Sequence, residues 1–280
     1  MITALDHLVL LCPDITEGEH TYSQLLGVPP SWRSAGAGQA SVLFRLGNMA
    51  LELIAPQGED ETAAKLRKMT EGGAILTTLV YQTDDLAGDH HLMTRRGLSP
   101  QEIQPGQSQE RDSSALRHWQ SFRLPDAKMA GVKSFVLQPE QQDWAYTQPE
   151  GTGQVTQLDH LVINTPNPDR TVATYGARLG LRLALDRTAT QSQTRFLFFK
   201  VGDLTLEIIH RLDAEADPEA DDTIWGITWQ TETLEDAHKR LSEAGVTVSE
   251  IRTGRKPGSH VFTVKSDTLD VPTLFIQHER

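Results

Sequence analysis

The chain has 280 residues, a net charge of −12 and an apolar fraction of 38%. That length is too great for one ordinary small domain and suits two domains of about 140 residues each. The negative charge argues against a nucleic-acid backbone or an anionic membrane as the main partner. The single cysteine, Cys12, excludes an intramolecular disulfide and a zinc site built from several cysteines.

No apolar run approaches the ~18 residues that a membrane-spanning helix needs, and the N-terminus shows no signal-peptide pattern. We therefore expect a cytoplasmic protein that works as a monomer or a homodimer. Its partner is expected to be a small molecule, with no nucleic acid, no membrane and no organic cofactor involved.

The first half of the chain alternates apolar strand patterns with helical ones. The expected elements are a strand over 4–12, a helix ending at Leu26, strands over 31–38, 41–46 and 49–55, a helix over 59–70, a strand over 74–82, a helix over 84–96, and strands over 116–124 and 131–138. Residues 101–114 are polar and rich in Gln, Ser and Gly, and therefore predict an exposed loop.

A polar segment, 139–154, separates this half from a second one that repeats its order. We place the domain boundary within it, which gives domains at 1–148 and 155–280. The second half is expected to contain helices ending at Leu179 and Ala244, and strands over 158–164, 182–186, 195–201, 204–210, 223–230, 246–251, 260–264 and 272–277. Residues 213–222 are acidic and predict a solvated loop.

The two halves share two short strings at nearly constant separation. Leu-Asp-His-Leu-Val occurs at 5–9 and again at 158–162, so His7 and His160 are 153 residues apart (160 − 7). The string at 47–54 is echoed at 202–209, so Glu52 and Glu207 are 155 residues apart (207 − 52). Two echoes in register indicate an internal duplication. Each half itself consists of two units of strand, helix and three strands.

These strings, which open and close a strand–helix–three-strand unit, resemble the vicinal oxygen chelate superfamily. That superfamily includes glyoxalase I, the bleomycin-resistance proteins and the extradiol dioxygenases. The first half is similar to its glyoxalase-like single-domain group through residues 116–119, 134–137 and 143–144. The resemblance implies an α+β fold in which four βαβββ modules pair into two half-barrel domains. It implies the fold more specifically than the reaction, because one fold hosts many chemistries.

In that superfamily, paired modules curl round a divalent metal whose ligands come from the first and last strands of a module. The resemblance implies four candidate metal ligands: His7, Glu52, His160 and Glu207. The two glutamates are also the candidate catalytic residues. Side chains alternate along a strand, which puts Leu5, His7, Val9 and Leu11 on one face. Imidazole together with carboxylate suits Zn, Ni, Fe or Mn.

The second and fourth units lack the ligands that such a metal requires. The position that corresponds to His7 holds Thr78 in the second unit and Gly226 in the fourth, and the last strands, 134–138 and 273–277, contain no carboxylate. If each unit pairs with its neighbour, each half has two ligands. If the first unit faced the third, all four ligands would form one set. A ring-cleaving dioxygenase is in doubt, since a single ligand position of that group is matched.

Each candidate also has a structural interpretation. The histidines could bond across strands, and a glutamate in an apolar strand, which is costly unless it is paired, could form a salt bridge to Arg45 or Arg195. Four residues are candidates for binding the substrate, as a cavity wall or as groups that attract an anion: Trp119, Arg45, Arg195 and His260. Core packing and surface salt bridges are the alternatives for them.

Two functions of different classes follow. The first is a glyoxalase-like protein that binds a small oxygen-rich metabolite in a half-barrel cup, as an enzyme with metal-dependent lyase or isomerase chemistry. The alternative is a metal-free protein that sequesters a toxin or antibiotic, as bleomycin-resistance proteins do. Because Arg195, His260 and the basic segment 255–258 are expected near one rim, we expect the second half to bind a small anion and the first half to be a scaffold.

Overall fold

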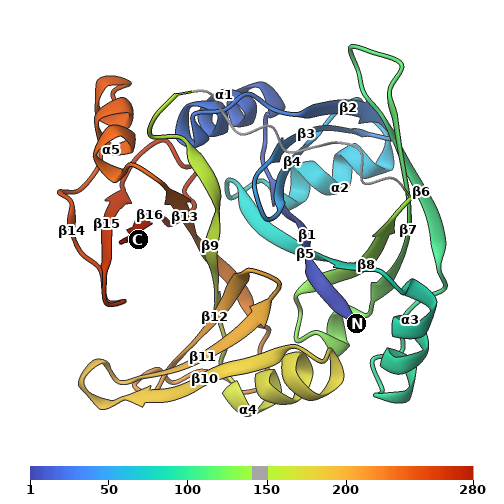
Figure 1. Ribbon diagram of the computed structural model, residues 1–280. Helices are drawn as coiled ribbons and strands as arrows, with labels where there is room; N and C mark the ends of the chain where they lie inside the picture. Colours follow the sequence, from blue (N-terminus) through green and yellow to red (C-terminus); the bar gives the residue numbers. More distant parts are fainter. Residues whose placement is uncertain (141–150, 280) are drawn as a thin grey trace.

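The structure is a computed structural model that describes residues 1–140 and 151–279. The expected end of the first domain at residue 148, and most of the polar segment around it, fall on residues 141–150 and lie outside the described residues. Figure 1 shows two sheets side by side, one from each half of the chain.

Each sheet has eight strands, in the order β2-β3-β4-β1-β5-β8-β7-β6 and β10-β11-β12-β9-β13-β16-β15-β14. The strands of the first sheet are β1 (Ile2–Leu11), β2 (Trp32–Gly36), β3 (Gln39–Arg45), β4 (Ala50–Pro56), β5 (Ile75–Thr83), β6 (Gln104–Gln109), β7 (Leu116–Leu124) and β8 (Lys133–Pro139). Those of the second are β9 (Val155–Asn164), β10 (Arg182–Ala189), β11 (Thr194–Val201), β12 (Leu204–Arg211), β13 (Thr223–Thr231), β14 (Arg252–Thr253), β15 (Ser259–Val264) and β16 (Thr273–His278).

Five α-helices lie in the described ranges: α1 (Ile15–Leu26), α2 (Glu61–Met69), α3 (Leu86–Arg95), α4 (Pro168–Thr171) and α5 (Leu234–Glu243). Shorter helical segments are η1 (Asp126–Lys128), η2 (Val172–Arg178, a π-helix that continues α4) and η3 (Thr190–Ser192). The expected α+β fold with four βαβββ units in two half-barrels is confirmed. No helix of the described ranges is long and apolar enough to cross a bilayer.

The centre of each sheet joins two neighbouring units. β1 lies between β4 of its own unit and β5 of the next, and β9 lies likewise between β12 and β13. The first unit therefore pairs with the second, and the third with the fourth. His7 and Glu52 lie in one sheet and His160 and Glu207 in the other, so the single four-ligand set is not formed.

Strand register shows that the two echoes occupy equivalent places. His7 stands beside Ala50 on β4, and His160 stands beside Thr205 on β12. Two residues further on, β4 and β12 carry Glu52 and Glu207 beside equivalent valines of β1 and β9. The duplication predicted from the sequence is therefore a duplication of structure.

Three stretches differ from the expectations. Residues 101–114 are not a loop throughout, because 104–109 pair with β7 as the edge strand β6. Residues 246–251 form a single isolated bridge instead of a strand. The acidic segment 213–222 is exposed except at Asp222, which is buried and hydrogen-bonded.

Helices cover the outer face of each sheet and leave the inner face for a site. Leu8 and Leu10 of β1 are buried in the core with Leu25 and Leu26 of α1. α2 is the exception, since its Leu66 reaches the inner side of the first sheet.

Side chains of Asn48 and Arg240 make several of the contacts that join the halves. Asn48, in the tight turn between β3 and β4, bonds the N–H and the C=O of Leu158 on β9 at 3.0 and 2.8 Å. Arg240 of α5 donates to the carbonyl oxygens of Gln24 and Leu25 at the end of α1. The cation satisfies carbonyls that the end of a helix leaves without partners.

Candidate functional site

The inner face of the first sheet encloses a cavity of about 630 Å³, which we call the first cup. α2 lies between β4 and the β6–β7 ribbon (Figure 1), and its Leu66 and Met69 line the cavity. The wall combines apolar side chains, which come from β1, β4, β5 and β8 among others, with polar side chains of the edge strands. A concave apolar site of this size suits a small organic molecule.

Asp6 and His7 both reach one site because β1 is bulged between them. Opposite β5, Leu5 pairs with Tyr81 and His7 pairs with Val80, so Asp6 is an extra residue. A bulge of this kind re-aims a side chain. It also leaves Leu5 in the core on the helix side, so the expectation that Leu5 shares the face of His7 is wrong.

The imidazole of His7 lies between two carboxylates. Its Nδ1 is 2.6 Å from Oδ1 of Asp6, and its Nε2 is 3.4 Å from Oε2 of Glu52. Burial alone would lower the pKa of His7, but the hydrogen bond to Asp6 and the charges of Asp6 and Glu52 raise that pKa. Burial would raise the pKa of Asp6, which its contact with His7 and two nearby arginines instead hold below the usual value. Asp6 therefore accepts the proton of Nδ1, and Nε2 faces Glu52.

A guanidinium that the sequence analysis did not single out completes the polar end of the first cup. Cζ of Arg117 is 5.5 Å from the ring centroid of Trp32 and 5.9 Å from that of Trp119. Its charge acts on Asp6 and Glu52. The signal that could have found it is alternation: Arg117 is two residues before Trp119 on one strand, so both face the cup.

The tryptophans on either side of Arg117 are held by β6. Nε1 of Trp32 donates to Oγ of Ser108 at 2.9 Å. Gly106 lies against the second indole, where a Cβ would come within 2.3 Å of Nε1 of Trp119. Glycine therefore allows β6 to cover this ring.

Both substrate-binding candidates of the first half lie on the first cup. Trp119 lines the cavity directly. Arg45 shares the inner face of β3 with Ser41 and Leu43, which also line it, and its charge acts on Asp6.

The second sheet carries an equivalent imidazole with more partners. Nδ1 of His160 is 2.7 Å from Oδ1 of Asp159, and its Nε2 is 3.3 Å from Oε2 of Glu207. Nε2 is also 2.9 Å from Oγ1 of Thr228, and Nε2 of His278 is 2.5 Å from Oδ2 of Asp159. Burial would raise the pKa of Asp159, but these two imidazoles hold it far below its usual value. Burial raises the pKa of Glu207.

Both substrate-binding candidates of the second half point to its helix side. Arg195 shares the buried face of β11 and donates to Asp169 and Asp186 at 2.9 and 2.8 Å. His260 shares the face of Phe262, which packs against α5. The sequence analysis predicted both strands correctly. Side chains alternate along a strand, however, and Arg195 and His260 lie on the outer face. The structure therefore does not bring Arg195 or His260 to the cup.

The inner face around His160 and Glu207, which we call the second cup, is open where the first is enclosed. A loop takes the place of α2, and the two-residue β14 takes the place of β6. Strand register gives the counterparts of Trp32 and Trp119 as Leu185 and Ser259, and β15 begins only at Ser259, so the position of Arg117 falls in the turn before that strand. The expectation that the second half binds a small anion and the first half is a scaffold stays a prediction, although Arg195 and His260, on which it rested, do not face the second cup.

Neither cup fits the divalent metal that the superfamily resemblance implies. In residues 1–140 and 151–279, no three His, Cys, Asp or Glu side chains are grouped so that they could hold a metal ion. The second unit lines the first cup with Thr78, Lys133 and Phe135, none of which is a carboxylate or an imidazole. His7 and Glu52 would supply two ligands, whereas catalytic zinc sites use three from the protein.

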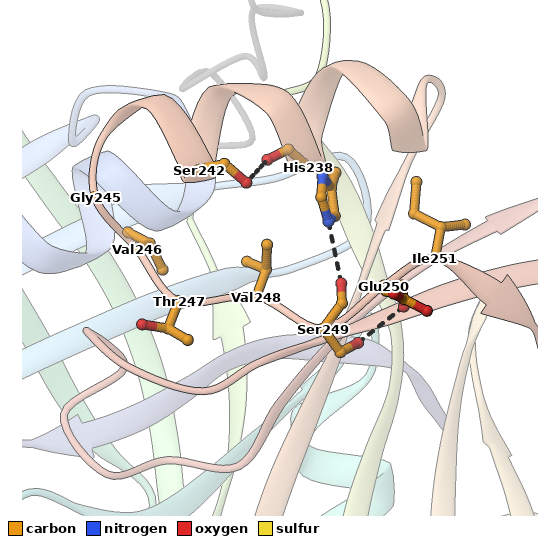
Figure 2. A pocket seen from close by; sticks show the side chains of 9 residues that line it. All are labelled: His238, Ser242, Gly245, Val246, Thr247, Val248, Ser249, Glu250 and Ile251. Carbon is orange, nitrogen blue, oxygen red and sulfur yellow. Dashed lines mark hydrogen bonds between the residues drawn. The ribbon is translucent and has the colours of Figure 1, made fainter.

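A second hollow, of about 570 Å³, lies outside both cups between α5 and residues 246–251 (Figure 2). Its polar groups bond one another. Nε2 of His238 is 3.0 Å from the carbonyl oxygen of Ser249, and Oγ of Ser242 donates to the carbonyl oxygen of His238. His90 makes the matching contact with a carbonyl in the first half. These histidines tie a helix to its neighbour, which is a structural role.

Three solved structures share the arrangement. A mutant of 4-hydroxymandelate synthase from Streptomyces coelicolor matches with a TM-score of 0.72 at 12% identity, over 99% of this chain and 93% of that one. A xylose isomerase-like TIM barrel/4-hydroxyphenylpyruvate dioxygenase fusion protein matches with 0.65 at 13%, over 100% and 50%. BphC, a halotolerant catechol dioxygenase, matches with 0.61 at 13%, over 99% and 87%. Identities this low show the fold alone.

Sequence comparison identifies the family. No curated protein matches the chain. Residues 157–268 match the Glyoxalase/Bleomycin resistance protein/Dioxygenase superfamily, and residues 5–157 match the glyoxalase-like domain. The second match covers 153 of the 280 residues (157 − 5 + 1). The chain therefore belongs to the glyoxalase-like domain family, within the same superfamily in both of its halves.

Proposed function

We propose that the first cup binds a small oxygen-rich organic molecule and moves a proton on it, in chemistry of isomerase or lyase type. The observation that carries this proposal is the chain of Asp6, His7 and Glu52, which opens on an enclosed cavity. A carboxylate and an oriented imidazole are the groups that general acid–base catalysis uses.

Glu52 is the residue that accepts the proton. In the proposed step it takes a proton from a carbon next to a carbonyl group, the C–H electron pair forms a C=C bond, and the carbonyl π pair moves onto the oxygen. Returning the proton to a neighbouring atom completes an isomerisation, so no oxidant or reductant is needed. His7, 3.4 Å from Glu52, shares the proton, and Asp6 fixes the ring that does so. The proposed step also needs no metal, in line with the donor set of the cup.

Sequestration without turnover is the second candidate function. It is supported by the wall of the first cup, most of which is apolar, with aromatic side chains such as Trp119 and Phe135. Such a wall holds a hydrophobic molecule whether or not a reaction follows.

Deuterium exchange separates the two functions. We would incubate the protein with phenylpyruvate or 2-oxoisovalerate in D₂O and follow the proton signal next to the carbonyl group by NMR. Enzymatic exchange should fall by about 100-fold in Glu52→Gln, because a general base of this kind contributes about 10²–10⁴-fold. The matched change in the second half, Glu207→Gln, should stay within about twofold of the wild type. Saturable binding without exchange would support sequestration, and equal exchange by Glu52→Gln and wild type would contradict the assigned base.

A further inference from the structure

We propose that the guanidinium of Arg117 takes the place of the divalent metal in the first cup, and that the ligand is an organic acid whose carboxylate Arg117 binds. The inference deepens the proposed function, on which it rests, because it concerns the same cavity. It concerns a residue to which the superfamily resemblance gives no role.

The first cup carries the positive charges of Arg117 and Arg45 close to the carboxylates that would help to bind a metal. The charge of Arg117 acts on Glu52 and on Asp6, and the charge of Arg45 also acts on Asp6. A divalent ion held by His7 and Glu52 would be repelled by these guanidinium groups in a partly buried site, where charges are weakly screened. These guanidinium groups already balance part of the negative charge of Asp6 and Glu52.

The geometry of Arg117 suits a carboxylate. Its planar group lies between Trp32 and Trp119, and stacking on indole faces limits its rotation. A guanidinium can donate two parallel N–H bonds to the two oxygens of a carboxylate. Because the tryptophans are themselves held by β6, less conformational entropy is lost when the ligand binds.

The walls of the cavity define the rest of the ligand. Leu11, Ile54, Val80 and Phe135 line the cavity together with Trp119. An apolar wall next to a fixed cation selects an acid with an aromatic or branched apolar body. A neutral molecule of the same shape offers the guanidinium no charge-assisted hydrogen bonds, so the cup should discriminate between them.

The second cup provides an internal comparison. It keeps the histidine and the glutamate, but Leu185 and Ser259 stand in place of the tryptophans, and β15 begins only at Ser259, so the strand position that Arg117 holds has no equivalent there. The organic acid should therefore bind to one half of the chain, with one molecule per chain.

The experiment compares two probes of equal shape, naphthalene-2-carboxylate and naphthalene-2-carboxamide. Binding to the full chain, purified without a histidine tag, is measured by calorimetry with and without EDTA, and metal content is measured by mass spectrometry. We expect one carboxylate per chain, binding at least tenfold tighter than the carboxamide and unchanged by EDTA. Arg117→Met should weaken carboxylate binding at least tenfold and leave carboxamide binding within twofold. Arg117→Lys should give an intermediate affinity, and Lys256→Met in the second half should match the wild type.

The outcomes separate this inference from the function on which it rests. If both probes bind equally and Arg117→Met changes neither, the role of Arg117 is refuted while the first cup remains a binding site. Loss of carboxylate binding in EDTA, or one bound metal per chain that His7→Ala removes, would also refute it. Absence of binding by either probe would overturn both proposals. A thermal-unfolding curve like that of the wild type shows that each variant is folded.

Discussion

The first and second cups share a chain of Asp, His and Glu but differ in nearly everything around it. In the first, α2 and β6 close the cavity, and Arg117 and Trp119 face the imidazole of His7 across it. In the second, Thr228 hydrogen-bonds the imidazole of His160, and His278 hydrogen-bonds Asp159. The described connection between β12 and β13 forms no helix that would cover these residues. The shared chain is therefore compatible with two roles, one open to a ligand and one internal to the sheet.

The difference shows that the edge strands and the connections between units determine whether a duplicated module can bind a ligand. Both halves place their histidine by the same bulge in the same central strand. The connection of 18 residues between β4 and β5 (75 − 56 − 1) forms α2, and the equivalent one between β12 and β13 is an acidic loop. Such segments change readily while the scaffold is kept, which is why binding residues often lie on them.

Exchanging each histidine for alanine should separate activity from stability. His7→Ala should lower exchange by about 100-fold or more, because the ring beside Glu52 is lost. His160→Ala should leave exchange within about twofold but lower the free energy of unfolding by about 2 kcal/mol, because Asp159 and Thr228 lose a partner. Exchange measured by NMR should therefore separate the two variants, while urea titration should show a loss of stability in His160→Ala. Loss of exchange in His160→Ala as large as in His7→Ala would contradict the division of roles.

The contacts between the two halves are also expected to contribute unequally to the free energy of unfolding. Arg240 is partly buried and donates to Gln24, Leu25 and Gly153, so Arg240→Ala should lower the free energy of unfolding by about 2–3 kcal/mol. Arg96 makes one contact of 3.4 Å, with the carbonyl oxygen of Arg178 in the other half, so Arg96→Ala should cost under about 0.5 kcal/mol. Urea unfolding measures both, and Arg240→Lys, which keeps the charge, should recover part of the loss. Equal costs for the two alanine variants would show that the halves are held together elsewhere.

The fold was predictable because it depends on patterns that a strand or helix displays along its own sequence. The duplicated strings around His7 and Glu52 placed both residues on adjacent strands, and the register bears this out. The pairing of the units was left open, because it depends on which edges of β1 find partners. The bulge at Asp6 could not be predicted, since one extra residue in a strand changes no local pattern.

The site was less predictable than the fold, for a similar reason. Arg195 and His260 were assigned to the cup because their strands were placed correctly, but a shift of one residue exchanges the inner and outer faces. Arg117 was missed because residues 104–109 had no strand pattern, although they form the edge strand that covers Trp119. Alternation along β7 could have placed Arg117 beside Trp119. Its contact with Trp32, which is distant in the sequence, is a tertiary feature that no local spacing predicts.

The extra imidazole of the second half should give it a stronger pH dependence than the first half has, although the pKa values of both Asp6 and Asp159 are lowered. Nε2 of His278 bonds Asp159, whereas register places Pro139 at the equivalent position in the first half. The pKa of Asp159 is lowered on folding, so its contribution to stability is present above its usual pKa of about 4 and is lost as the pH falls below that value. His278→Gln should thus lower the free energy of unfolding by about 1–2 kcal/mol at pH 5.

That difference should shrink as the pH falls below about 4, because Asp159 then takes up a proton more readily in the unfolded chain than in the folded one. Urea unfolding at a series of pH values measures it, and subtraction of the two curves removes the carboxylates that both proteins share. A difference that stays constant from pH 5 to pH 2 would show that His278 acts through packing instead of charge.

A threonine that recurs at the end of a central strand gives the one expected gain in stability. In the first half, Oγ1 of Thr83 donates to Oδ2 of Asp89 at 2.6 Å, and both residues are buried. In the second half Thr231 holds the same place, but the residue six positions later is Ala237, and the buried Thr231 hydroxyl has no hydrogen-bond partner among the described residues. A buried hydroxyl without a partner is destabilising, while valine has the same shape. Thr231→Val should therefore raise the free energy of unfolding by about 1 kcal/mol, and Thr83→Val should lower it by about 1–2 kcal/mol, because Asp89 loses a donor. Urea unfolding of the two variants measures both signs, and a loss of stability in Thr231→Val would show that its hydroxyl is satisfied in solution.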